Sequence, residues 1–290
     1  MKHTKATISL FQRTVTRYYR KCRRDFPWRE TRDSYAILVS EIMLQQTQTD
    51  RVVPKYLEWM KTFPTLEALA QAGVGDVLKK WQGLGYNRRV LNLKRSVEMI
   101  VKEYNGVFPK TVKEIDTLPG VGPYTAGAIG AFAFGIPSVF IETNIRTVYL
   151  HFFFKGKRKV RDEEILEIIE RTLPTTKKNT TTPSRRRDTP PQLRRGSIRE
   201  WYNALMDYGS MLKKTEGNEN TRSAQYTKQP AFKGSRREVR GAILKRAAEK
   251  RKVTVDDFKQ YVSAHPVADI MSELTEEGFL KKEGKAFRLA

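Results

Sequence analysis

Two glutamates lie where a carboxylate could take part in acid–base chemistry. Glu41 falls within LVSEIML, an apolar helical stretch in which burial favours the protonated form of a carboxyl group, as a general acid requires. Glu142 follows an apolar run in VFIETNIRTV, where the pattern predicts a helix start, with Asn144 close behind. Each has a structural alternative, because Glu41 could be a helix-surface carboxylate and Glu142 a helix cap. Both are therefore candidate catalytic side chains.

A glycine-rich turn is the most informative motif. The segment 114–128 reads EIDTLPGVGPYTAGA, which predicts a short helix, a tight turn and a second helix rich in Ala and Gly. Gly120 and Gly122 are expected to allow backbone geometry that side chains would block. The amides that open the second helix are expected to hold a nucleic-acid phosphate. The alternative is an ordinary helix turn with closely packed small residues.

The charge of the chain points to an anionic partner. The 290 residues carry 55 Lys and Arg against 32 Asp and Glu, for a formal net charge of +23. Nucleic acid is the partner that best explains such a balance, although charge alone names no substrate. Gln45, Gln46 and Gln48 add amide groups that can donate to and accept from base edges.

Cysteine and histidine usage excludes several kinds of site. The single cysteine, Cys22, cannot form an internal disulfide, and it cannot build a zinc or iron–sulfur site on cysteine ligands. The three histidines are too few and scattered for a metal centre. No apolar run is long enough for a membrane span, and the first residues lack the apolar stretch of a secretory signal. We therefore expect a soluble, intracellular protein without cofactors.

The elements that must position these residues are helices. Apolar residues recur at helical spacing through most of 7–172, and strand-like alternation is scarce, so the sequence predicts an all-α fold. The stretch 175–197, rich in Thr, Pro, Arg and Lys, is expected to be a disordered basic insertion, either a solvated loop or a phosphate-binding arm. Residues 1–233 are expected to form the main domain, and 234–290 a small winged-helix-like module ending in a hairpin that turns at Gly284. The clearest predicted helices are 35–47, 53–62, 90–104, 125–134, 163–173, 199–212, 236–250, 253–262 and 267–277.

Four segments together resemble one family. SEIMLQQTQ with Glu41, WQGLGYNR with Tyr86, LPGVGPYTAGAI and IETNIRTV occur in the order and approximate spacing of MutY-type adenine DNA glycosylases of the helix-hairpin-helix superfamily. The resemblance is close over about 26–150 and looser to 233. It implies a two-lobed helix-hairpin-helix glycosylase fold, in which a target adenine is extruded from the duplex into a pocket between helical domains.

The resemblance also implies roles for the candidate residues. Glu41 matches the glutamate that protonates N7 of adenine, and Glu142 matches the carboxylate that stabilises an oxocarbenium-like sugar. Tyr124 and Asn144 match residues that hold the acid and the attacking water. Because relatives that also cleave the strand carry a lysine at the position of Tyr124, base removal without efficient strand cleavage is expected. The implied DNA-binding residues are Gln45, Gln46, Tyr86, Arg88, Gly120, Val121, Gly122, Tyr124 and Thr125, of which Gln46 and Tyr86 resemble wedge residues that open the base step.

The sequence departs from the family in three places. The family normally has Asp where this chain has Glu142, and the extra methylene could shift the carboxylate. Most members hold a four-cysteine iron–sulfur cluster after the glycosylase core, whereas 208–233 contains no cysteine. The winged-helix-like segment stands where the family has a Nudix-like domain that reads oxidised guanine. We therefore expect no cluster, with a monovalent cation at the hairpin as the one candidate ion.

The expected function is removal of adenine mispaired with 8-oxoguanine or guanine in double-stranded DNA, by a monomer in the cytoplasm, nucleoid-associated if the source is prokaryotic. A mismatch thymine or uracil glycosylase is the enzymatic alternative, because such relatives share the hairpin. A DNA-binding protein that has lost catalysis would keep the charge and the hairpin but would need neither glutamate. An RNA-binding protein is supported by charge alone.

Overall fold

The computed structural model describes residues 4–174 and 197–290. The basic insertion predicted over 175–197 lies outside the described residues, except for Ser197, with which helix α11 begins. The chain divides into two compact units. Unit 1 comprises Met1–Ile37, Lys110–Thr117 and Val121–Lys228, and unit 2 comprises Leu38–Pro109, Leu118–Gly120 and Gln229–Ala290.

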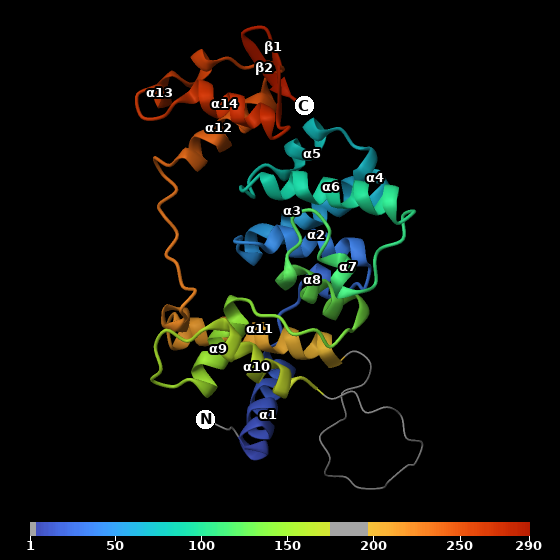
Figure 1. The fold of residues 1–290 in the computed structure, drawn as a ribbon, viewed down its shortest axis with the longest axis vertical. Coiled ribbons are helices and arrows are strands. Elements are labelled where there is room, and N and C mark those ends of the chain that lie inside the picture. The colour runs from blue at the N-terminus through green and yellow to red at the C-terminus, as the bar shows by residue number, and fades with distance from the viewer. Residues whose placement is uncertain (1–3, 175–196) are drawn as a thin grey trace. The chain divides into compact units, whose positions relative to one another are not determined.

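Unit 1 is helical throughout its described residues. Figure 1 shows α1, α9, α10 and α11 grouped together, with α11 packed against both α1 and α9. The elements of unit 1 are α1 (Lys5–Cys22), a 3-10 turn (Pro27–Arg29), α7 (Val112–Ile115), α8 (Pro123–Ile129), a π-helical turn (Gly130–Phe134), α9 (Thr143–Phe153), α10 (Asp162–Thr172), α11 (Ser197–Thr215) and a 3-10 turn (Glu219–Arg222).

Aromatic side chains form the centre of this unit. Phe11 of α1 is buried, and its ring makes edge contacts with Tyr149 and Phe153 of α9 and with Trp201 of α11, at centroid distances of 5.3, 4.9 and 5.6 Å. Edge-to-face aromatic pairs add to the free energy gained by burying apolar surface. Helix α1 is thereby fixed to α9 and α11.

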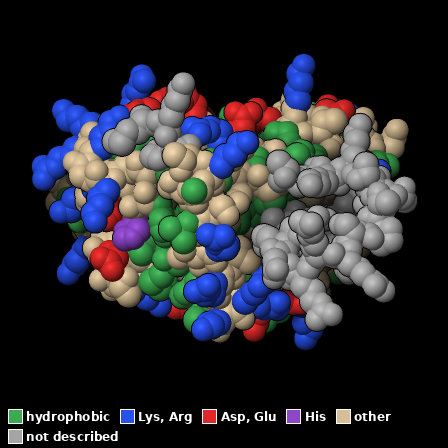
Figure 2. Space-filling model, turned by 90° about the horizontal axis from the view of Figure 1, so that it is seen from below, with side chains coloured by type: hydrophobic (Ala, Val, Ile, Leu, Met, Phe, Trp, Pro, Cys, Tyr) green, Lys and Arg blue, Asp and Glu red, His purple; other side chains and the backbone are tan. Residues whose placement is uncertain are grey.

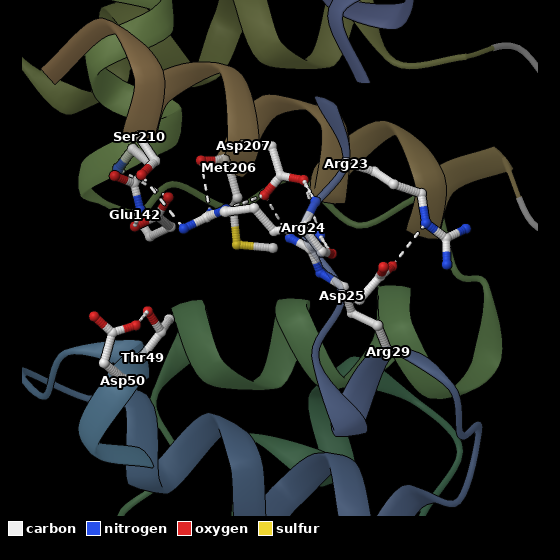
Figure 3. Close-up of polar contacts among 11 residues, drawn as sticks. Arg23, Arg24, Asp25, Arg29, Thr49, Asp50, Glu142, Met206, Asp207 and Ser210 are labelled. Atoms are coloured by element: carbon white, nitrogen blue, oxygen red, sulfur yellow. Dashed lines mark hydrogen bonds and ion pairs between the residues drawn. The ribbon is translucent and has the colours of Figure 1, made fainter. Parts of the chain in front are cut away.

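A buried ion cluster fixes the segment after α1 to α11. Asp207 accepts bonds from Arg24 Nε at 2.7 Å and from Arg29 Nη2 at 2.8 Å, and its side chain is 1% exposed. Arg24 also donates to the Ser210 hydroxyl at 3.3 Å. Figure 3 shows the Arg24 side chain extending along α11 from Asp207 to Ser210, with Glu142 beside Ser210. Although burial alone would raise the pKa of Asp207, its bonds to Arg29 and Arg24 lower it overall.

Replacing Asp207 by Asn should destabilise the protein by about 3–5 kcal/mol at neutral pH, because the buried guanidinium of Arg29 and the half-buried one of Arg24 lose their counter-charge. Since folding lowers the pKa of Asp207, this contribution is complete above the ordinary aspartate value of about 3.9 and is lost as the pH falls through the lower folded-state value. Urea unfolding of both proteins between pH 2 and 7 measures the difference. A gap that stays constant down to the lowest pH would contradict the assignment.

Unit 2 has its own core around Trp59, whose ring contacts Trp81 at a centroid distance of 5.7 Å. Helix α2 begins in unit 1 and continues into unit 2. The elements of unit 2 are α2 (Ser34–Leu44), α3 (Thr49–Thr62), α4 (Leu66–Gln71), α5 (Val74–Trp81), α6 (Arg88–Glu103), α12 (Arg236–Glu249), a 3-10 turn (Val255–Phe258), α13 (Lys259–Val262), α14 (Val267–Glu276), β1 (Leu280–Glu283) and β2 (Ala286–Leu289).

The C-terminal module, residues 234–290, packs within unit 2. Helix α12 lies next to α5, as Figure 1 shows, and it also contacts α14 and β2. Strands β1 and β2 pair antiparallel with Leu280 opposite Leu289. Gly284 has a φ of 65° in the two-residue turn, which confirms the predicted hairpin. Likeness to a winged helix and a domain boundary at 233 remain predictions.

The predicted all-α fold is confirmed. Each of the predicted helices overlaps a described one, and the boundaries differ by a few residues; the helix predicted over 35–47, for instance, is Ser34–Leu44. The segment predicted over 125–134 begins as α8 and ends as a π-helical turn. In the described part of the chain, no helix combines the length and apolar character that a bilayer crossing needs.

Candidate active site and nucleic-acid interface

Glu142 is the N-cap of α9. Its Oε1 accepts bonds from the backbone amides of Asn144 and Ile145 at 2.8 and 2.9 Å, and its Oε2 accepts one from Asn144 Nδ2 at 3.2 Å. A carboxylate at a helix N-terminus interacts favourably with the helix dipole. The capping alternative is therefore correct, and it is compatible with a catalytic role because the capping bonds fix the direction of the carboxyl group.

Helix α11 packs closely against the start of α9. A Cβ added at Gly209 would lie 2.1 Å from the carbonyl oxygen of Asn144, so only glycine allows this approach. Lys213, one turn further along α11, donates to the Thr143 hydroxyl at 3.2 Å, and that hydroxyl lies 3.2 Å from Oε2 of Glu142. Burial lowers the pKa of Lys213, and the charge of Glu142 opposes that shift. The candidate carboxylate thus has a half-buried cation nearby.

Substitution of Glu142 should separate capping from charge. Glu142→Ala removes the cap and should cost about 1–2 kcal/mol of stability, whereas Glu142→Asn supplies another good capping side chain and should cost less than about 1 kcal/mol. Thermal unfolding of the two variants beside the parent chain measures this. Equal losses in both variants would show that the cap contributes nothing.

Glu41 lies in α2 and is only 7% exposed. Its neighbours in the helix, Val39, Ile42 and Met43, are buried as well. The helix-surface alternative is therefore wrong, because the side chain is buried. Glu41 belongs to unit 2, whereas Glu142, Asn144 and Tyr124 belong to unit 1. Tyr124 of α8 is half-buried, and its ring contacts Phe140 at 5.7 Å.

The glycine turn forms as predicted between α7 and α8. Gly120 has a φ of 76°, and a Cβ there would lie 2.5 Å from the Cβ of Asn92, so glycine is required. The same expectation for Gly122 is wrong, because its φ of −110° suits any residue and no atom lies within 4 Å of an added Cβ. Gly122 is the N-cap of α8. Val121 and Thr125, which were predicted to bind DNA, are buried, and that role stays a prediction.

A half-buried arginine that the sequence analysis missed connects two loops of unit 2. Arg89 donates from Nη1 to the carbonyls of Ile42 and Met43, both at 3.0 Å, and to that of Gln45. These carbonyls end α2, where the helix dipole favours a cation. From Nη2 it donates to the Thr47 hydroxyl at 3.1 Å and to the carbonyls of Leu84 and Gly85 at 3.2 and 3.1 Å. Burial lowers the pKa of Arg89 to about 10, so it is still charged at neutral pH.

The two predicted wedge residues lie on the loops that Arg89 joins. Gln46 follows α2 with a φ of 55°, and Tyr86 precedes α6 with a φ of 49°. Both are non-glycine residues in the left-handed region, which is uncommon and often marks functional positions. Gln46 and Tyr86 are exposed, and Gln45 is half-buried. Arg88, the arginine chosen from the sequence, is 69% exposed and pairs with Glu277 at 2.9 Å.

Arg89→Lys should destabilise the protein by about 3 kcal/mol, because one ammonium group cannot reach acceptors on two loops and leaves buried carbonyls without donors. Arg88→Lys is the matched control, since an exposed ion pair contributes about 0–1 kcal/mol. Urea unfolding of both variants measures the two losses. Equal losses would contradict the role of Arg89.

The segment after α11 is held by hydrogen bonds. Asn220, which is buried, donates to the Thr143 carbonyl at 3.1 Å and to the Thr147 hydroxyl at 2.8 Å. Arg222 donates to the carbonyls of Lys157, Leu150 and Phe154. Among the described residues, no group of three or more His, Cys, Asp and Glu side chains could hold a metal ion. The exposed Cys22 is far from this segment in the sequence.

The basic surface is spread out. Figure 2 shows Lys and Arg side chains distributed over the viewed face, with smaller acidic groups and an apolar area between them. On this face, positive charge does not gather into one patch. Such a distribution favours non-specific electrostatic attraction of a polyanion.

Comparison with known proteins places these motifs in a family. The profile of the HhH-GPD superfamily of base excision DNA repair proteins matches residues 39–186. The adenine DNA glycosylase of Mycolicibacterium smegmatis is 44% identical over 132 residues, which are 45% of this chain and 45% of that protein. The human adenine DNA glycosylase is 39% identical over 152 residues, 49% of this chain and 28% of that protein. The chain thus matches less than half the length of these relatives.

Solved structures show the same fold. A thermostable thymine-DNA glycosylase superposes with a TM-score of 0.57 and 25% identity, covering 71% of this chain and 87% of that one. A non-covalent endonuclease III–DNA complex superposes with a TM-score of 0.52 and 18% identity, covering 70% and 85%. At 18% identity the second likeness concerns the fold alone.

Proposed function

The chain belongs to the HhH-GPD superfamily of base excision DNA repair proteins, and we propose that it hydrolyses the N-glycosidic bond of adenine mispaired with 8-oxoguanine or guanine. One observation carries most of the proposal: the carboxyl group of Glu142 is oriented at the start of α9 by two backbone amides and Asn144, in a chain that also buries Glu41. The similarity to adenine DNA glycosylases supports adenine as the target.

In the proposed reaction, Glu41 donates a proton to N7 of the flipped adenine, so that the bond from C1′ breaks and the base leaves as a neutral molecule. The positive charge that develops on the sugar is stabilised by the carboxylate of Glu142, which its bonds within α9 hold in place. Water then adds to C1′ and loses a proton, which leaves an abasic sugar. Asn144 and Tyr124 position the carboxylate and the water.

Strand cleavage should not accompany base release. The hairpin presents Tyr124 where strand-cleaving relatives have a lysine, so no amine nucleophile stands at that position. Phosphate contacts at the hairpin, with Gly120 and Gly122 in its turn, and the wedge side chains of Gln46 and Tyr86 are proposed to hold the DNA. Stacking on an aromatic ring contributes about 1–3 kcal/mol per base.

We also propose that the protein acts without an iron–sulfur cluster. Its one cysteine cannot supply the ligands of such a cluster, so the donor set does not fit. The bonds of Asn220 to Thr143 and Thr147 place the segment after α11 against the start of α9, and they would take over a cluster's positioning role.

A thymine glycosylase acting on mismatches is the second candidate. The structural similarity to a thymine-DNA glycosylase favours it, as does a Tyr at position 124. Duplexes containing adenine opposite 8-oxoguanine, thymine opposite guanine and uracil opposite guanine separate the candidates by single-turnover rate. We expect the first to be processed fastest and to yield abasic sites that break only in alkali. Faster release of thymine would overturn the adenine assignment, and an imine trapped by borohydride would overturn the absence of strand cleavage.

Glu41→Gln should reduce base release at least about 100-fold, because general acid catalysis contributes about 10²–10⁴-fold. Binding to the mispaired duplex should be retained, since the amide keeps the shape of the side chain. Glu103→Gln, an exposed position at the end of α6, is the matched control. The neutral cap variant Glu142→Asn should lose activity while retaining stability. Undiminished turnover in Glu41→Gln would remove this residue from the mechanism.

A further inference from the structure

The C-terminal module contacts one predicted wedge side chain, and the segment that leads into the module contacts the other. Arg237 of α12 donates from Nη1 to the Tyr86 hydroxyl at 2.7 Å, although 151 positions separate them. Gln229 donates from Nε2 to Oε1 of Gln46 at 3.1 Å. All four residues belong to unit 2.

The Tyr86 ring lies close to two cations. The guanidinium carbon of Arg89 is 5.5 Å from the ring centroid, and that of Arg237 is 5.7 Å. Arg89 belongs to the buried network below the loop, whereas Arg237 comes from the C-terminal module. Cation–π attraction acts within about 6 Å, and the bond to the hydroxyl fixes the far end of the ring. Tyr86 is 38% exposed, yet its ring lies close to Arg89 and its hydroxyl is bonded to Arg237.

The module that supplies Arg237 is itself anchored near this loop. Glu277 at the end of α14 pairs with Arg88 at 2.9 Å, and its carbonyl accepts a bond from Arg95 at 3.2 Å. A second bond from Arg237, to the carbonyl of Pro230 at 2.8 Å, ties the connecting segment to α12. The guanidinium of Arg237 is therefore fixed from several sides.

We propose that Arg237 is a positioning residue for Tyr86, and that the C-terminal module is thereby part of the device that opens the base pair. The inference rests on the proposed function, because it assumes that Tyr86 enters the duplex. Arg237 sets the ring direction before DNA arrives, so that less rotational freedom is lost on insertion. Gln229 does the same for the Gln46 amide.

The test is a double-mutant cycle with Arg237→Ala and Tyr86→Phe, each of which removes the hydroxyl–guanidinium bond. A 2-aminopurine beside the mispair reports unstacking by its fluorescence, and single-turnover base release is followed in parallel. Each single variant should slow unstacking about tenfold, the effect of losing one charge-assisted hydrogen bond. The double variant should be no slower than the single ones, and Arg237→Lys should recover part of the rate.

Arg236→Ala is the matched control. It removes the same charge from the same helix, but Arg236 pairs with Glu273 inside the module. It should change the salt dependence of binding and leave the unstacking rate unaltered. Equal effects of Arg236→Ala and Arg237→Ala, or additive effects in the cycle, would overturn the inference and leave Arg237 as a phosphate contact. Thermal unfolding checks that each variant folds.

The outcomes also distinguish this inference from the proposed function. If the parent chain releases no base from any duplex, the proposed function fails, and the fluorescence of 2-aminopurine still reports whether Tyr86 and Arg237 act together. If the parent chain releases adenine and the cycle shows no coupling, only the role of Arg237 fails.

Discussion

One half-buried guanidinium group, that of Arg89, joins the two loops of unit 2 that carry Gln46 and Tyr86. Arg89 ends α2 by binding its last carbonyls, and it holds the loop before α6 by two more. Without a cation there, the half-buried carbonyl groups at the end of α2 would lose a donor, and leaving such a group without its partner costs more than the bond itself contributes. Gln46 and Tyr86 protrude from the two loops that this single side chain connects. The distance between Gln46 and Tyr86 is therefore set by the hydrogen bonds of Arg89 to both loops.

In unit 1 a buried negative charge, that of Asp207, likewise joins separate segments of the chain. Asp207 holds Arg24 and Arg29, and so fixes the segment after α1 to α11. Helix α11 in turn approaches the start of α9 so closely that Gly209 is required. The carboxylate of Glu142 is fixed by this packing and by its own capping bonds. The bonds that cap α9 are thus the same bonds that orient the candidate catalytic side chain.

Local patterns in the sequence predicted the helices and the motifs well. Apolar spacing located each described helix that it was used to predict, and the LPGVG turn was found from its glycines. The importance of Arg89 was missed because Arg88 and Arg89 are identical in type, and only the helical phase distinguishes them: Arg89 shares a face with the buried Leu93 and Ser96. The helical spacing of Arg89, Leu93 and Ser96 could have identified Arg89 from the sequence as the inward-facing arginine.

Other features could not be predicted from local patterns. The requirement for glycine at 120 depends on Asn92, a residue from another helix, whereas Gly122 has no such neighbour. The contacts of Arg237 with Tyr86 and of Gln229 with Gln46 join positions more than 150 residues apart. A basic residue on a helix carries no sign of such a partner, because long-range packing alone brings them together.

The left-handed backbone of Gln46 and Tyr86 has a thermodynamic consequence. Residues in this region carry strain of about 1–3 kcal/mol each, which the surrounding fold must offset. That cost is met when the chain folds, so a ligand that meets these loops finds their main-chain conformation already selected. Neither loop has to be reordered at that encounter, so the conformational entropy of the two peptide units is lost once, during folding, and not again during binding.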